Sequence, residues 1–194
     1  MDAAPAQVVV FDLDDTLITC TRANRGPRVP RQTFHVLQTL RRLRIPVAVM
    51  SYNSLASLWV NKLHLRPYVA CCVTPCAASS GRAELFAETM AALGFHDGVP
   101  PPTVAYFDDR QDNLDAVQSA HPAIVAVHVP DPLVLHRQVK DCLCKLGRQD
   151  VWSPRDAAPD APMAPLLDYY PEDTVCTGLF STQRDASQHF RVVE

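Results

Sequence analysis

The sequence predicts an α/β fold: a doubly wound, Rossmann-like parallel sheet of about five strands, with helices on both faces. Three observations lead to this prediction. Short apolar runs of strand length recur between residues 7 and 128. Segments with the hydrophobic period of an amphipathic helix stand between them. The runs are apolar almost throughout, which is typical of parallel strands that are covered on both faces.

The expected elements alternate regularly along the chain. Strands are expected at 7–12, 45–51, 68–73, 102–107 and 123–128. Helices are expected at 31–43, 54–64, 82–94, 110–120 and 132–146. In the first of these helices, Phe34, Leu37 and Leu40 recur at helical spacing. A strand followed by a helix in each unit favours right-handed crossovers and hence parallel strands.

Composition divides the chain into a domain, 1–147, and an acidic, proline-rich tail, 148–194. The tail holds five prolines, and eight acidic residues against four arginines, and no hydrophobic period survives in it. Its apolar segment, 166–180, is expected to pack back on the core or across the mouth of a site. No oligomeric state is predicted.

Cysteine content and hydropathy limit the cellular compartments in which we expect the protein. The seven cysteines have no regular spacing, and the start, MDAAPAQ, lacks the basic and apolar regions of a signal peptide. No apolar stretch approaches the ~20 residues that a membrane span needs. We therefore expect free thiols, no membrane association and a cytoplasmic location, with the nucleus also open. A net charge of -3 argues against a general polyanion binder.

Carboxylates follow two of the predicted strands. The first strand runs directly into Asp12, Asp14 and Asp15, and the fourth ends in Asp108 and Asp109. In extended backbone, residues i and i+2 point to the same side, so Asp12 and Asp14 are expected to share a face. Because the carboxyl ends of parallel strands meet at one edge, these acids should converge there. A Mg²⁺ ion would offset their mutual repulsion.

These residues resemble the motifs of the haloacid dehalogenase (HAD) superfamily of phosphatases. FDLDDTL matches the DxDx[TV] signature, and DxDxT, a serine, a basic residue and DDxxxN follow in the family's order over residues 7–147. The branch of small magnesium-dependent protein phosphatases is similar. The resemblance implies a phosphomonoester hydrolase that acts through an aspartyl-phosphate intermediate and needs Mg²⁺.

The resemblance also implies roles for the four aspartates. Asp12 would be the nucleophile, and Asp14 would protonate the leaving group and then activate water. Asp12, the backbone carbonyl of Asp14, and Asp108 would hold Mg²⁺, with Asp109 directly or indirectly at the metal.

Further residues are assigned to substrate binding. Ser51 would bind a phosphate oxygen, with Tyr52 and Asn53 beside it, and Asn53 is also expected to cap the next helix. Arg82 stands where the family has a lysine that braces the nucleophile and the phosphate. Lys62 is the alternative for that role.

The spacing leaves no room for a cap domain, which implies an open site and favours a phosphorylated protein (Tyr, Ser or Thr) as substrate. A nucleic-acid 3′-phosphatase is an alternative, because seven arginines and no acid lie between positions 22 and 44. A small-molecule phosphatase is another. Arginine in place of lysine leaves open a weakly active or inactive binding protein. Cys76–Arg82 also matches the Cys-x5-Arg loop of cysteine phosphatases.

Overall fold

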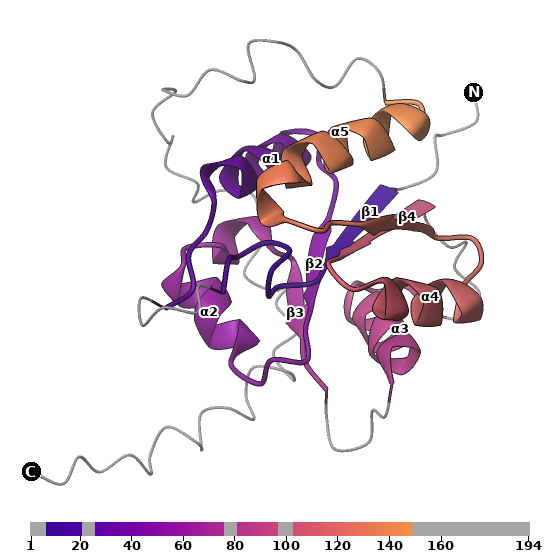
Figure 1. The fold of residues 1–194 in the computed structure, drawn as a ribbon. Helices are drawn as coiled ribbons and strands as arrows, with labels where there is room; N and C mark the ends of the chain where they lie inside the picture. Colours follow the sequence, from indigo (N-terminus) through magenta and orange to yellow (C-terminus); the bar gives the residue numbers. More distant parts are fainter. Residues whose placement is uncertain (1–6, 21–25, 76–80, 97–102, 149–194) are drawn as a thin grey trace, which may run out of the picture.

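Five parallel strands form one sheet in the order β3-β2-β1-β4-β5 in a computed structural model, which describes residues 7–20, 26–75, 81–96 and 103–148 (Figure 1). The strands are β1 (Gln7–Phe11), β2 (Val47–Met50), β3 (Cys71–Val73), β4 (Thr103–Asp108) and β5 (Val125–His128). The chain starts in the middle of the sheet and winds outward first to one side and then to the other. The predicted doubly wound α/β fold is confirmed.

Helices cover both faces of this sheet (Figure 1). They are α1 (Arg31–Arg42), α2 (Ala56–Lys62), α3 (Arg82–Ala92), α4 (Gln111–Ala120) and α5 (Leu135–Lys145). Helices α1, α2 and α5 share one hydrophobic layer with the sheet, and α3 and α4 share the other. The gaps at 21–25, 76–80 and 97–102 are too short to hold a domain, so the described chain carries no large cap.

Strand β1 shows why the apolar runs are continuous. Val9 and Phe11 point into the layer beneath α1 and α5, whereas Val8 and Val10 point into the layer beneath α3 and α4. Because successive residues alternate between two covered faces, none of them can be polar without cost.

Three details of the predicted elements are wrong. The strand expected from residue 68 begins at Cys71, because Pro67 lies in a 3-10 turn, Arg66–Tyr68. The helix expected from residue 132 begins at Leu135, after a 3-10 turn that the Asp131 side chain caps at the N–H of Leu133. Strand β5 lies at an edge of the sheet and is only partly buried, with His128 exposed.

The described residues answer two further expectations. None of their helices is both long enough and apolar enough to cross a bilayer. The described cysteines are free thiols: Cys20, Cys71, Cys72, Cys142 and Cys144. The tail predicted at 148–194 lies, beyond Arg148, outside the described residues, and so does the apolar segment 166–180.

Candidate functional site

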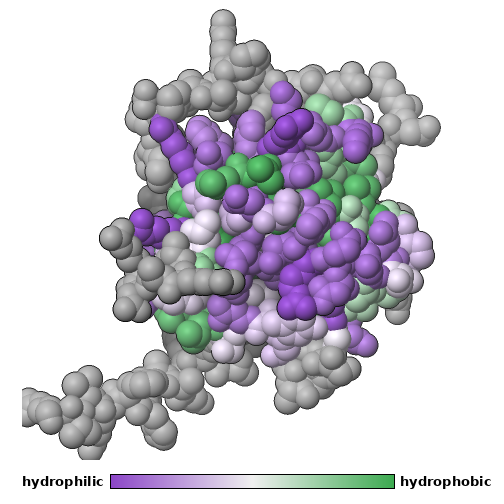
Figure 2. Space-filling view, viewed as in Figure 1, coloured by the Kyte–Doolittle hydropathy of each residue, from purple (hydrophilic) through white to green (hydrophobic). Residues whose placement is uncertain are grey.

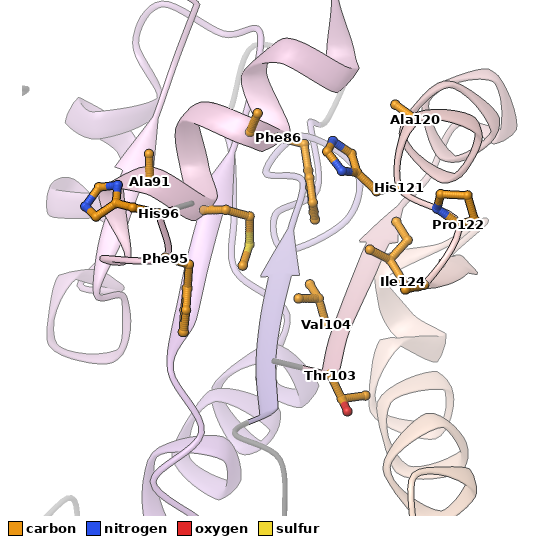
Figure 3. Close-up of a pocket in the computed structure, with 13 residues that line it drawn as sticks. Phe86, Ala91, Phe95, His96, Thr103, Val104, Ala120, His121, Pro122 and Ile124 are labelled. Atoms are coloured by element: carbon orange, nitrogen blue, oxygen red, sulfur yellow. The ribbon is translucent and has the colours of Figure 1, made fainter. Parts of the chain in front are cut away.

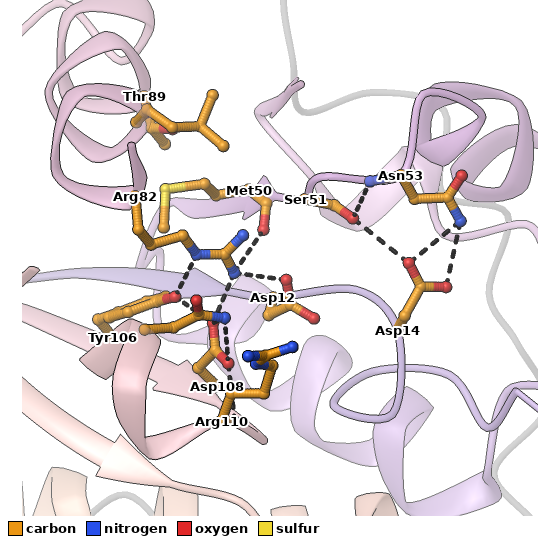
Figure 4. Close-up of polar contacts among 12 residues, drawn as sticks. Asp12, Asp14, Met50, Ser51, Asn53, Arg82, Thr89, Tyr106, Asp108 and Arg110 are labelled. Atoms are coloured by element: carbon orange, nitrogen blue, oxygen red, sulfur yellow. Dashed lines mark hydrogen bonds and ion pairs between the residues drawn. The ribbon is translucent and has the colours of Figure 1, made fainter. Parts of the chain in front are cut away.

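The candidate site lies at the carboxyl edge of the sheet, where the parallel strands end (Figure 4). The backbone N–H of Asp12 donates to the carbonyl of Phe107 at 2.8 Å, and that of Ser51 donates to the carbonyl of Val73 at 3.1 Å. Each residue is thus held to the neighbouring strand just beyond its own strand. This backbone pairing fixes where the side chains of Asp12 and Ser51 start.

Arg82 joins the ends of three strands. It is the first residue of α3 and is only 4% exposed. Its Nη2 donates to Asp12 Oδ1 and to Asp108 Oδ2, both at 2.5 Å, and lies 3.3 Å from the carbonyl oxygen of Met50. Its Nε donates to the hydroxyl of Tyr106 at 2.8 Å. The prediction that Asp12, Asp108 and a basic residue converge is therefore confirmed in the geometry.

The alternative base, Lys62, is not at this site. Lys62 is exposed in the last turn of α2, where its Nζ lies 5.7 Å from the ring centroid of Trp59. Arg82 is thus the basic residue that contacts Asp12.

The buried charges at this point do not cancel, because two carboxylates share one guanidinium. Burial raises the pKa of Asp12 to about 7, and it outweighs the opposing effect of Arg82. Burial opposes the charge on Arg82 as well, but Tyr106 and the two carboxylates raise its pKa overall. Arg82 therefore stays protonated, whereas Asp12 is poised to gain or lose a proton near neutral pH.

Asp108 is occupied by donors from the protein itself. Oδ1 accepts the backbone N–H of Arg110 at 2.9 Å and the amide of Asn113 at 3.0 Å. Oδ2 accepts hydrogen bonds from Arg82 and from the hydroxyl of Tyr106. It also accepts one from the amide nitrogen of Asn113, at 3.1 Å. A carboxylate has about four lone-pair positions, and these contacts use them. Asp108 thus holds Arg82 in place in this structure, and its assignment as a metal ligand stays a prediction.

Asp109 differs from its neighbour in having a half-buried side chain. Burial and the charge of Asp108 raise its pKa. Its backbone oxygen lies 2.8 Å from His128 Nε2. Within the described residues no three side chains of His, Cys, Asp or Glu gather in a way that could hold a metal ion. The four acids that were predicted to gather therefore do not form one cluster, because Arg82 lies between Asp12 and Asp108.

Asp14 has a separate set of partners, although it was expected to share a face with Asp12. The amide of Asn53 donates to both of its carboxylate oxygens, at 3.2 and 3.1 Å. The hydroxyl of Ser51 donates to it at 3.4 Å, and the thiol of Cys20 at 3.1 Å. Asp12 is the last residue of its segment that is bonded to β4, so the chain turns before Asp14 and directs it toward Asn53 (Figure 4).

Asn53 caps a turn and not a helix, which corrects the prediction. Its Oδ1 accepts the N–H of Leu55 at 2.9 Å, while α2 begins only at Ala56. Its own N–H donates to Ser51 Oγ at 3.1 Å. This Asx turn aims the Asn53 amide at Asp14.

Tyr52 stands at the mouth of the site. Its side chain is 50% exposed, and its ring centroid lies 5.1 Å from the Cζ of Arg82, at the range of a cation–π contact. Neither Tyr106 nor Cys20 was predicted as a site residue, whereas Asn113 was predicted as the last residue of the DDxxxN motif, with local capping as the alternative. The sequence did contain a signal for Tyr106. Side chains two residues apart in a strand point to the same side, so residue 106 of β4 could have been placed beside residue 108.

The geometry argues against two alternative interpretations, the cysteine-phosphatase loop and an arginine-rich surface for nucleic acid. Cys76 lies outside the described residues, but the arginine of that motif, Arg82, is already engaged by Asp12 and Asp108. The arginines of this stretch that the structure describes, from Arg28 on, also do not form one patch. Helix α1 runs from the carboxyl edge back toward the start of β2, so Arg41 and Arg42 in its last turn lie at the opposite edge of the sheet.

A pocket of about 780 Å³ lies elsewhere, against α3, the start of β4 and the segment that follows α4 (Figure 3). Its walls include Phe86, Phe95, Val104 and Ile124. Thr103, the first residue of β4, also lines it. It therefore opens at the amino edge of the sheet and holds none of the acids of the candidate site.

Comparisons with known proteins bear on the fold. No known protein family and no curated protein is matched by the sequence. A HAD-superfamily hydrolase from Ehrlichia chaffeensis has a TM-score of 0.55 at 11% identity, over 75% of this chain and 99% of that one. A haloacid dehalogenase-like hydrolase from Streptococcus pneumoniae has a TM-score of 0.52 at 11% identity, over 66% and 85%.

A third solved structure was determined with a metal. It is the N-terminal part of a Bacteroides fragilis protein that contains a phosphatase domain, in complex with Mg. Its TM-score is 0.53 at 16% identity, over 70% of this chain and 39% of that one. This chain therefore has the fold of HAD-superfamily hydrolases, as its motifs predicted.

Proposed function

We propose that this protein is a Mg²⁺-dependent phosphomonoester hydrolase that acts through an aspartyl-phosphate on Asp12. The observation that carries the proposal is the position of Asp12 at the end of the central strand, with Arg82 Nη2 at 2.5 Å from its Oδ1. A fixed cation on one carboxylate oxygen leaves the other, Oδ2, directed for attack. The fold shared with HAD hydrolases supports the same reaction class.

The reaction is a double displacement at phosphorus. Asp12 Oδ2 forms a bond to phosphorus while the bond to the leaving oxygen breaks, and Asp14 gives that oxygen its proton. Asp14 then takes a proton from water, whose oxygen attacks phosphorus and releases Asp12 and inorganic phosphate. Asn53 and Ser51 support this role, because they hold the carboxylate of Asp14 in one orientation.

The oxygen donors that remain fit Mg²⁺, with Asp109 in place of Asp108. Mg²⁺ is usually bound by one or two carboxylates together with waters and substrate phosphate, so Asp12, Asp109 and the backbone carbonyl of Asp14 suffice. When bound, the cation would neutralise charge on the phosphoryl group and the carboxylates. The complex of the Bacteroides fragilis phosphatase domain with Mg supports this choice of ion.

A phosphorylated protein is the substrate class that the surroundings favour. In the described part of the chain, the large apolar side chains that are exposed all follow a strand at the carboxyl edge: Tyr52, Leu55 and Leu58 after β2, and Leu133 and Val134 after β5. Figure 2 shows a few apolar patches on an otherwise mostly hydrophilic face of the molecule. Apolar side chains on both sides of an open polar site suit a polypeptide that carries apolar residues beside its phosphate.

Hydrolysis of a generic aryl phosphate tests the reaction. Asp12→Asn should abolish turnover and leave the fold intact, EDTA should silence the wild type, and Asp115→Asn, an exposed α4 residue, should keep the wild-type rate. Turnover by Asp12→Asn, or indifference to EDTA, would contradict the mechanism. A wild type that binds phosphopeptides but turns over no phosphoester would instead be a binding protein.

A second measurement tests the substrate class. Replacing Leu55 and Leu58 by serine should raise KM for a phosphopeptide with apolar flanking residues and leave KM for the aryl phosphate unchanged. Equal changes for both substrates would count against a peptide-binding surface. Sugar phosphates, nucleotides and nucleic-acid 3′-phosphates in the same panel measure the alternatives directly.

A further inference from the structure

Tyr106 is a buried tyrosine that none of the sequence motifs contains, yet it contacts two members of the site. Its hydroxyl accepts the Nε–H of Arg82 at 2.8 Å and donates its own proton to Asp108 Oδ2 (Figure 4). Its side chain is fully buried in the layer beneath α3 and α4. A single hydroxyl therefore bridges the guanidinium to the carboxylate that also binds it.

An arginine at this position needs such an acceptor. A guanidinium is planar and carries N–H donors on three nitrogens, whereas a lysine carries its donors on one. Nη2 of Arg82 is used by Asp12 and Asp108, and the Nε–H is a separate donor that needs an acceptor of its own. Arg82 is only 4% exposed, so an Nε–H without an acceptor would destabilise the folded state. Alternatively, the guanidinium would rotate out of its present plane.

The ring of Tyr106 is fixed from behind. Phe86 of α3 packs against it with ring centroids 6.0 Å apart, and Tyr106 is held in β4 between β1 and β5. The hydroxyl therefore has a set position relative to Asp108, which lies two residues further on the same strand. Tyr106 binds Nε of Arg82 and Asp108 binds Nη2. Two hydrogen bonds from fixed positions define the orientation of the planar guanidinium.

We propose that Tyr106 is a positioning residue that sets the plane of the Arg82 guanidinium and thereby directs Nη2 at Asp12. Arg82 and Tyr106 act as a matched pair in which the hydroxyl is needed only when residue 82 is an arginine. This inference rests on the proposed function for its kinetic test, but the contact itself is measurable without activity.

A double-mutant cycle on aryl phosphate hydrolysis tests the pair, after the wild type has been shown to turn over. Tyr106→Phe should lower kcat by about 10- to 100-fold, as expected for one hydrogen bond to a charged group, with KM little changed. Arg82→Lys should also lower kcat. In the Arg82→Lys background, adding Tyr106→Phe should change kcat by less than about twofold, whereas independent sites would multiply their losses.

Tyr68→Phe is the matched control. It removes the hydroxyl of another fully buried tyrosine, whose oxygen has no hydrogen-bond partner among the described residues. It should leave kcat unchanged. A general effect of removing a buried hydroxyl would appear in both variants, whereas a positioning effect would appear only at Tyr106.

Nitrogen NMR of the arginine Nε–H groups gives a readout that needs no turnover, and its wild-type and Arg82→Lys spectra do not depend on the folding of Tyr106→Phe. The wild type should show one Nε–H that exchanges slowly with water and that disappears in Arg82→Lys. In Tyr106→Phe this signal should shift and exchange faster. The proposal is overturned by a wild type without a protected Arg82 Nε–H, by a Tyr106→Phe variant with wild-type kcat, or by losses that multiply in the double mutant. An inactive wild type with the protected signal would refute the proposed function alone.

Discussion

The charge balance around Arg82 predicts that Asp12→Asn stabilises the protein at alkaline pH while it removes the proposed nucleophile. Asp12 and Asp108 share one guanidinium, so the ionised site keeps one uncompensated negative charge. Asparagine has nearly the same shape as the protonated acid and carries no charge. In Asp12→Asn, Asp108 and Arg82 would form a neutral pair.

The size of the effect follows from the pKa of Asp12, which is raised from 3.8 to about 7. At a pH between these values the folded protein binds a proton that the unfolded chain has lost, so stability falls as pH rises. The loss is complete above pH 7 and, at about 1.4 kcal/mol per pKa unit, is on the order of 4 kcal/mol. The variant lacks this loss.

Urea unfolding of both proteins without Mg²⁺, from pH 4 to pH 8, measures the difference in the free energy of unfolding. Other titrating groups largely cancel in this difference. We expect it to be near zero at pH 4 and to grow in favour of Asp12→Asn up to pH 7, with Asp115→Asn showing no such trend. Mg²⁺ should stabilise the wild type more than the variant. A variant that is less stable than the wild type at pH 8, or a difference that does not depend on pH, would refute the argument.

Three further changes have defined outcomes. Arg82→Met leaves two buried carboxylates without a counter-charge, so urea unfolding at pH 7.5 should show a loss of about 3–5 kcal/mol; a loss below about 1 kcal/mol would mean that the ion pairs are not formed in solution. Asp109→Asn should raise the Mg²⁺ concentration for half-maximal activity by at least about tenfold, and an unchanged requirement would exclude Asp109 as a ligand. Truncation after Arg148 should change KM for an aryl phosphate if the segment 166–180 covers the site, and identical kinetics would remove that role.

The fold could be read from the sequence because hydrophobic period and strand length are local signals. The strands at the centre of the sheet are buried on both faces, and their apolar runs were visible without a structure. The errors lie where local signals compete. Pro67 allows a 3-10 turn within an apolar run, and the Asp131 cap separates Pro132 from the helix that follows.

The site was predictable as a set of residues and not as a set of contacts. The ends of parallel strands meet at one edge, which brought Asp12, Asp108 and Arg82 together from positions far apart in the chain. Which oxygen binds which donor depends on distances of a few tenths of an ångström, which no sequence period encodes. The proposed use of Asp109 in place of Asp108 at the metal is of this kind, since it is argued from the amide of Asn113 reaching back to Asp108.

The proposed division of the acids between two cations, Arg82 and a metal ion, would explain how so many carboxylates fit at one edge. Arg82 is a permanent cation that compensates Asp108 and one oxygen of Asp12, with Tyr106 and Asn113 completing the coordination of Asp108. In the proposed mechanism, the other oxygen of Asp12 and the side chain of Asp109 would bind a cation that comes and goes with the phosphate. In the proposed mechanism, a permanent charge would keep Asp12 in place between turnovers, because burial alone would favour its protonation near pH 7. Under this proposal the arginine and the metal ion would have different tasks, and losing the arginine should affect the fold as well as the rate.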